Sequence, residues 1–119
     1  SFEAPYTLCD PQAARWAVES AGRIGVPFRV ALPTYGHLLA FDANGKFLSL
    51  SAEGPRPNWP TNAQVRKVES NSQELGDLIH DWTESRPAAM RGVIWYRLPV
   101  SSDKYNWTWP TLQRVMRGE

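Results

Sequence analysis

Side chains that could contact a polar ligand lie at or near the ends of two short apolar runs of the sequence. Tyr35 follows the run 26–33 after one residue, Thr34, and Trp95 and Arg97 lie near the end of the run 92–99. An aromatic ring offers a stacking surface, and a guanidinium offers up to five hydrogen-bond donors to hydroxyl groups or a carboxylate. These residue types are suited to binding a sugar, so Tyr35, Trp95 and Arg97 are candidate substrate contacts.

A carboxylate that could serve in acid–base chemistry lies in the loop 51–61, which is rich in glycine and proline. Glu53 in this loop could donate or accept a proton, or bind a hydroxyl group. Glycosidases commonly use two carboxyl groups roughly 5–10 Å apart, and Asp103 is the nearest second candidate. Because loop carboxylates are usually solvated, the sequence identifies no catalytic residue, and Glu53 is kept as a substrate contact.

Structural roles compete with each of these functional interpretations. Tyr35 stands beside Gly36 in a turn, where glycine can supply a positive φ angle. Trp95 can equally be a core residue, and Arg97 can pair with a nearby carboxylate. The same ambiguity covers the six tryptophans of the chain, since aromatic side chains fill cores and interfaces as well as binding clefts.

Neither a metal nor a cofactor is expected. Cys9 is the only cysteine, which excludes an internal disulfide and a cysteine-rich zinc site. His37 and His80 belong to different expected elements and have no companion ligands at metal-binding spacing. The chain also lacks the phosphate-binding, dinucleotide-binding and serine-hydrolase motifs.

The composition narrows the classes of partner. The net charge is +1 and 21% of the residues are charged, so bulk electrostatics gives no reason to expect nucleic acid or an anionic membrane. No apolar stretch approaches the roughly 18 residues of a membrane span, so no membrane insertion is expected. The sequence does not determine the cellular compartment and leaves a periplasmic or secreted location open.

The segments around the first apolar run predict a helix followed by a strand. Asp10 and Pro11 suit a helix N-cap and the first helical position, so a helix is expected over 11–24. Residues 26–33 form a short apolar run bounded by prolines, which is typical of a buried parallel strand. The residues 34–36 break this run, so Tyr35 is expected at the carboxyl end of the strand.

A β-rich insertion is predicted between this strand and the next helix. Asn44-Gly45 between two apolar segments is a strong hairpin signal. Residues 64–69 alternate in polarity, as a third strand of the hairpin sheet would. The insertion therefore covers residues 37–69.

A second helix, strand and helix complete the chain. Asn71 with Glu74 forms a capping box, and one apolar stripe follows it at helical spacing: Leu75, Leu78, Ile79 and Trp82. Residues 92–99 again form a buried-type strand. Thr108 is the expected N-cap of the last helix.

The order of elements predicts an α/β fold. Helices that alternate with buried strands imply parallel β/α units, but a closed eightfold barrel needs roughly 250 residues. A free-standing pair of parallel strands would leave open edges. The expected fold is therefore a partial (β/α) barrel (its last β/α units) with a β-hairpin insertion, in which residues 1–119 are a single domain and the C-terminal portion of a larger barrel. A small independent three-layer α/β domain is the alternative.

Several segments of the chain resemble a known family. They are residues 26–36, residues 51–55 and residues 91–99, followed by Asp103, Asn106 and Trp107. Together they resemble the C-terminal end of a bacterial family named domain of unknown function 3142. The resemblance covers most of the chain and implies an architecture more than an activity.

A more distant resemblance is to the family 18 glycoside hydrolases, which are (β/α) barrels. There a late strand ends in a Pro-x-Tyr-Gly-like turn, a mostly β insertion follows, and the last strand carries a tryptophan that floors the sugar site. The matching positions are 33–36, 38–50 and Trp95. The resemblance implies a carbohydrate-active barrel, and its acidic catalytic motif has no counterpart here and would lie upstream of Ser1.

Three hypotheses for function follow from these patterns. In the first, the chain is a glycoside hydrolase-like barrel portion that contributes to a sugar-binding cleft, with the upstream remainder of the barrel as its partner. In the second, it is a non-catalytic module that binds a glycan or a protein through exposed aromatic side chains. In the third, it is a purely structural α/β domain whose tryptophans are all core residues.

Overall fold

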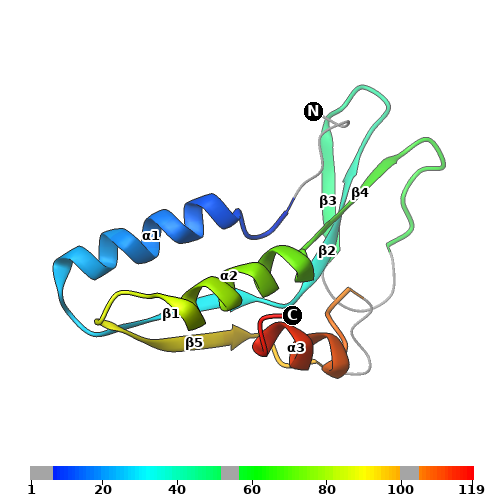
Figure 1. Cartoon of the computed structure of the whole chain (residues 1–119). Coiled ribbons are helices and arrows are strands. Elements are labelled where there is room, and N and C mark those ends of the chain that lie inside the picture. Colours follow the sequence, from blue (N-terminus) through cyan, green and yellow to red (C-terminus); the bar gives the residue numbers. More distant parts are fainter. Residues whose placement is uncertain (1–6, 52–56, 100–104) are drawn as a thin grey trace.

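The computed structural model describes residues 7–51, 57–99 and 105–119, which form a mixed α/β fold. Its three helices and two small sheets are shown in Figure 1. In chain order the elements are α1 (Pro11–Ile24), β1 (Phe28–Pro33), β2 (Gly36–Phe41), β3 (Phe47–Ser51), β4 (Gln64–Glu69), α2 (Ser72–Glu84), β5 (Met90–Tyr96) and α3 (Trp109–Met116). One sheet is the pair β1–β5, and the other has the strand order β3-β2-β4.

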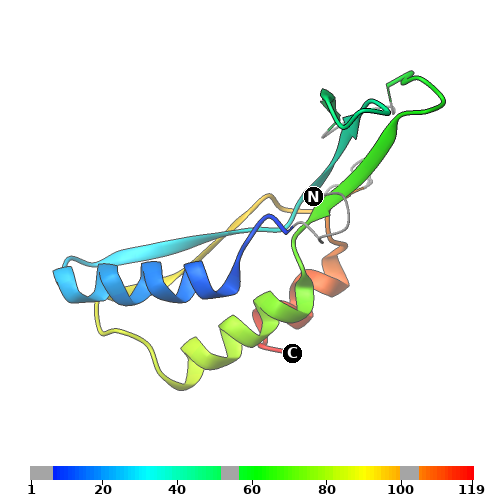
Figure 2. The same cartoon turned by 90° about the horizontal axis from the view of Figure 1, so that it is seen from above.

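The strands β1 and β5 run side by side in the same direction, which confirms the prediction of a parallel pair. Leu32 lies opposite Trp95 and Pro33 lies opposite Tyr96, so both strands deliver their carboxyl ends to one edge. Helices α1 and α2 lie on the same side of this pair in Figure 2. On the opposite face the side chains are open to solvent: Ile94 is 52% and Tyr96 is 59% exposed. We call this face the open face.

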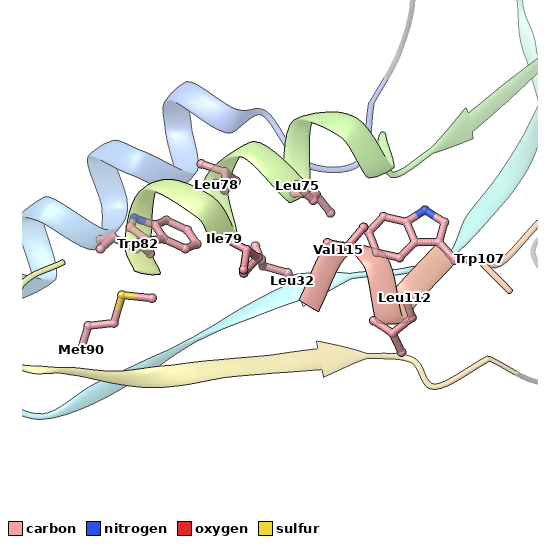
Figure 3. Close-up of a cluster of buried hydrophobic side chains, with 10 residues drawn as sticks. Leu32, Leu75, Leu78, Ile79, Trp82, Met90, Trp107, Leu112 and Val115 are labelled. Atoms are coloured by element: carbon pink, nitrogen blue, oxygen red, sulfur yellow. The ribbon is translucent and has the colours of Figure 1, made fainter. Parts of the chain in front are cut away.

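The hydrophobic core fills the space between the parallel pair and the helices (Figure 3). The predicted stripe of α2 is buried, with every one of its four apolar side chains at most 7% exposed. Helix α3 adds Leu112 and Val115, each 1% exposed, and β1 adds Leu32. The core therefore joins one helix face to one sheet face, which is the usual two-layer solution for an amphipathic helix and strand.

The helix termini follow the predicted capping signals with one exception. Asp10 accepts a hydrogen bond from the Gln12 amide, and Asn71 accepts one from the Glu74 amide at 3.0 Å. Thr108 precedes α3 as predicted, but its side chain bonds no backbone amide. Its hydroxyl oxygen instead lies 3.2 Å from that of Thr111, one turn further along.

The predicted hairpin and its third strand are present in the antiparallel sheet, which projects away from the parallel pair in Figure 1. The turn between β2 and β3 is closed by the Asp42 carboxylate, which accepts from the amides of Asn44 and Lys46 at 2.8 and 2.9 Å. Gly45 adopts a φ angle of 86°, which L-residues other than glycine rarely adopt. Local turn chemistry therefore specifies this sheet.

Two expectations from the sequence can be compared with the fold. The α/β class is confirmed: the described ranges form two small sheets and no closed barrel, so the observed fold class is mixed α/β and the partial barrel stays a proposal. The tryptophans are not all core residues, because Trp16 is 67% and Trp109 is 51% exposed. Trp107, in contrast, is 8% exposed and holds the start of α3 against the core.

Candidate functional site

Two tyrosines meet where the parallel strands end. Tyr35 follows β1, Tyr96 is the last residue of β5, and their ring centroids lie 5.6 Å apart at an interplanar angle of 84°. Edge-to-face packing is a favoured arrangement of two aromatic rings, and Tyr96 keeps more than half of its surface open to solvent. We call this pair, together with the neighbouring residues Thr34 and Arg97, the rim.

Thr34 holds the rim together from inside the protein. This residue is completely buried. Its amide donates to the Tyr96 carbonyl at 2.7 Å, its hydroxyl donates to the Arg97 carbonyl, and its own carbonyl accepts from the Trp107 amide at 2.9 Å. A buried residue with its backbone and side-chain polar groups bonded is strongly specified in position. The backbone on both sides of the Tyr35–Tyr96 pair is therefore tied to one residue.

The antiparallel sheet is fastened to the same place. The indole of Trp107 donates to the Ser70 carbonyl at 2.9 Å, and the Ser70 amide donates to the Tyr35 carbonyl at 3.4 Å. Gly36 permits this close approach, because a Cβ atom there would lie 2.8 Å from the Tyr105 carbonyl oxygen. The ends of β1, β4 and β5 and the segment before α3 therefore converge on the rim.

The structure pairs Tyr35 with Tyr96, and places Trp95 on the other face of β5. Trp95 is half-buried, packs against the core and lies 6.1 Å, centroid to centroid, from the ring of Trp107. Strand alternation puts neighbouring side chains on opposite faces, so Tyr96 and not Trp95 is the aromatic residue on the open face. The alternation in the sequence already placed Trp95 and Tyr96 on opposite faces of β5. It could not show which of the two faces the helices cover.

Of the other candidate residues, the structure describes Arg97 but not Glu53 or Asp103. Arg97 is half-buried directly after Tyr96, with its carbonyl held by Thr34. Glu53 and Asp103 lie outside the described residues, so their contact with the rim stays a prediction.

Two titratable side chains outside the rim have shifted pKa values. Burial raises the pKa of the Cys9 thiol, and the nearby carboxylates of Asp10 and Glu74 raise it further. Burial lowers the pKa of His37 on β2. Within residues 7–51, 57–99 and 105–119, no cluster of three or more His, Cys, Asp and Glu side chains could hold a metal ion.

A hollow of about 470 Å³ lies elsewhere, beside β4 and the start of α2. Its lining includes Lys67 and Glu69, whose side chains form an ion pair at 3.2 Å. Each of these two side chains is half exposed, so water screens the pair. The two opposite charges offset each other, and the rim remains the better candidate site because it combines a strand-end position with paired aromatic rings.

Comparisons with known proteins give one match. A family model described as a domain of unknown function (DUF3142) matches residues 3–101. The search of curated proteins and the search of solved structures found no match. Among the helices of the described ranges, none is long and apolar enough to cross a membrane.

Proposed function

The chain belongs to the DUF3142 family, and on that premise we propose that it supplies part of a carbohydrate-binding cleft in a larger, glycoside hydrolase-like (β/α) barrel. In this proposal β1 and β5 belong to the last β/α units of the barrel, and their open face lines its interior. The remainder of the barrel, upstream in the polypeptide, is the partner that completes the cleft.

The observation that carries the proposal is the Tyr35–Tyr96 pair at the carboxyl edge of two parallel strands. Ligands of (β/α) barrels bind at this edge, where loops from several strands meet. An aromatic ring offers a broad apolar surface at a small cost in side-chain entropy, which suits it to the apolar face of a sugar ring. The rim therefore supplies binding surface and not acid–base chemistry.

The roles of the candidate residues follow from their places. Tyr96 stacks on the sugar, and Tyr35 holds it edge to face and borders the same subsite. Arg97 donates to sugar hydroxyl groups from the end of β5. Trp95 supports the rim from the covered face through its contact with Trp107. Glu53 lies outside the described residues, and its hydrogen bond to the ligand is proposed from the sequence alone.

A calorimetric titration with soluble β-linked glucose and N-acetylglucosamine oligosaccharides tests the proposal on the full-length polypeptide. Tyr96→Ala should weaken binding by up to about tenfold, since an aromatic contact is worth roughly 0.5–1.5 kcal/mol and 1.4 kcal/mol is tenfold. Phe47→Ala is the matched control, because Phe47 is likewise more than half exposed and packs edge to face on another ring, but it lies on β3, away from the rim.

The outcomes separate the candidate functions. No measurable affinity of the wild-type protein for any of these sugars, or an unchanged affinity in a folded Tyr96→Ala variant, contradicts the sugar-binding role of the rim. Binding that depends on Tyr96 supports it. Hydrolysis of a bound oligosaccharide would then distinguish a glycosidase from a non-catalytic binding module.

A further inference from the structure

We propose that the outer edge of β1 and the adjoining face of α1 dock a further β/α unit of the same polypeptide, whose strand runs parallel to β1. The inference rests on the proposed barrel and extends it. It assigns the side on which the neighbour attaches, the direction of its strand and the residue at which the contact ends.

The backbone of β1 has one edge paired and one edge free. The amide of Phe28 donates to the Ala89 carbonyl at 2.9 Å, and the amide of Thr34 donates to the end of β5 at 2.7 Å. Alternate residues of a strand bond to the same neighbour, so Arg29 and Ala31 direct their N–H and C=O groups to the opposite edge. Within the part of the chain that the structure describes, β5 is the only strand that pairs with β1.

A mostly apolar groove of about 310 Å³ runs beside the free edge, between β1 and α1. Small side chains line it: Ala17 and Ala21 from the helix and Ala31 from the strand. A free strand edge beside such a groove suits an extended segment, because main-chain hydrogen bonds supply affinity while alternate side chains enter the groove. The surface is therefore shaped for a strand.

Helix α1 carries a second apolar stripe next to this groove. Val18 faces the core and is 2% exposed, whereas Trp16 and Ile24 are 67% and 74% exposed. The residues of this second stripe share one face of the helix by their spacing: Ala13, Trp16, Ala17 and Ile24. Apolar residues on more than one face of a helix indicate burial against more than one neighbour. The stripe is suited to a second helix, packed beside α1.

The position of α1 selects a β/α unit as the occupant. Figure 1 shows α1 on the side of β1 away from β5, while α2, which leads into β5, overlies β1. The helix of a β/α/β unit packs back onto the two strands that it connects. Since α1 leads into β1 through only three residues, its first turn lies at the carboxyl end of β1. A strand that enters α1 therefore runs parallel to β1.

Pro33 sets the end of the contact. Pro33 is the next residue after Arg29 and Ala31 whose backbone is directed to the free edge of β1. Proline has no N–H group to donate there. The docked strand therefore pairs with Arg29 and Ala31 and parts from β1 at Pro33. The rim directly beyond Pro33 remains accessible to a ligand.

Amide hydrogen exchange tests the proposal in two proteins, the 119-residue chain and the polypeptide encoded by its complete reading frame. The amides of Arg29 and Ala31 should exchange freely in the chain and at least about a hundredfold more slowly in the complete polypeptide. The amides of Val30 and Leu32, which face β5, are the internal control and should be protected in both. Equal exchange of Arg29 and Ala31 in the two proteins overturns the proposal.

A pair of substitutions on α1 gives a second readout. Ile24→Gln should lower the Tm of the complete polypeptide and leave that of the 119-residue chain unchanged, because Ile24 is 74% exposed in the chain. Glu19→Gln, on the polar face of α1, should change neither. An Ile24→Gln variant with an unaltered Tm in the complete polypeptide contradicts docking on this face.

Two further measurements identify what docks on β1: the dependence of amide protection on protein concentration, and the sugar affinity of the complete polypeptide. Protection of Arg29 and Ala31 that disappears on dilution would assign the edge to a second copy and overturn the proposal. Protection that persists on dilution supports a unit of the same polypeptide. A complete polypeptide with this protection but without sugar affinity would overturn the proposed function alone.

Discussion

The parallel pair and the antiparallel sheet of this protein are stabilised in different ways. β1 and β5 come from distant parts of the chain, and they are held through buried side chains such as Leu32, which is 1% exposed. The strands β2 and β3 are neighbours in sequence, and β3 presents Phe47 and Leu50 to solvent at 54% and 51% exposure. Burial therefore stabilises the first sheet, and local turn geometry contributes more to the second.

This difference in stabilisation indicates which part of the molecule can fix the side chains of a binding site in position. The rim lies at the point where both sheets meet, and buried hydrogen bonds of Thr34 and Trp107 connect it to the core. A subsite needs side chains whose positions are fixed by packing and by hydrogen bonds around them. The antiparallel sheet alone lacks a buried cluster of this size among its described residues, so the parallel pair is the scaffold.

The largest expected effect separates the two sheets directly. Leu32→Ala should lower the free energy of unfolding by about 2–5 kcal/mol, since it leaves a cavity in the core. The same truncation in Leu50→Ala should change it by about 0.5 kcal/mol or less, as for most exposed positions. Urea denaturation followed by circular dichroism measures both. Equal losses would show that the antiparallel sheet is as tightly packed as the core.

An intermediate effect is expected at the junction of the two sheets. Trp107→Phe keeps the aromatic ring but leaves the buried Ser70 carbonyl without its donor, which should cost about 1–3 kcal/mol. The matched control is Trp59→Phe, which removes an indole bond to the Ser49 hydroxyl, where water can substitute. Its expected cost is below about 1 kcal/mol.

Two readouts check the junction. Chemical denaturation should rank the two tryptophan variants in that order. Near-ultraviolet circular dichroism of Trp107→Phe should also show a change in the tyrosine region, because the Trp107–Ser70–Tyr35 chain of hydrogen bonds is broken. A tyrosine signal that matches wild type would contradict the role of Trp107 in holding the rim.

The smallest expected effect compares one glycine from each region. Gly45, in the hairpin turn, has a φ angle of 86°, and Gly25, after α1, has one of 82°. Alanine in this left-handed conformation costs about 1–2 kcal/mol at either position, because the strain belongs to the backbone and not to the surroundings. Thermal denaturation of both variants measures it. A much larger loss for Gly45→Ala would mean that the turn nucleates more than its own hairpin.

Local signals predicted much of the fold correctly. The helix over 11–24 and the strand over 64–69 have the predicted bounds, since Asp10, Pro11 and Gly25 act on their immediate neighbours. The strand predicted over 92–99 instead spans Met90–Tyr96. Its end is decided by Thr34, which binds the Tyr96 and Arg97 carbonyls from a distant part of the chain.

The sequence predicted where the candidate residues lie along their strands, but not which face of the sheet each one occupies. Tyr35 lies at the carboxyl end of a parallel strand, as its place after a buried-type run indicated. Alternation along β5 separated Trp95 from Tyr96 correctly, but it gives two equivalent assignments of the faces. Hydrophobicity favours neither, because both side chains are large and aromatic.

The sequence by itself determined the helices and the turn of the hairpin, because capping, turn and periodicity signals act over a few residues. The parallel run of the two apolar segments followed from the order of elements, since helices that alternate with buried strands imply parallel β/α units. Only the tertiary structure decided which aromatic ring meets Tyr35 and which edge of β1 stays free. Those outcomes depend on the side of the sheet that the helices cover. The apolar faces of the helices and strands that become buried are those that pack best against each other. This packing depends on contacts between segments far apart in the chain.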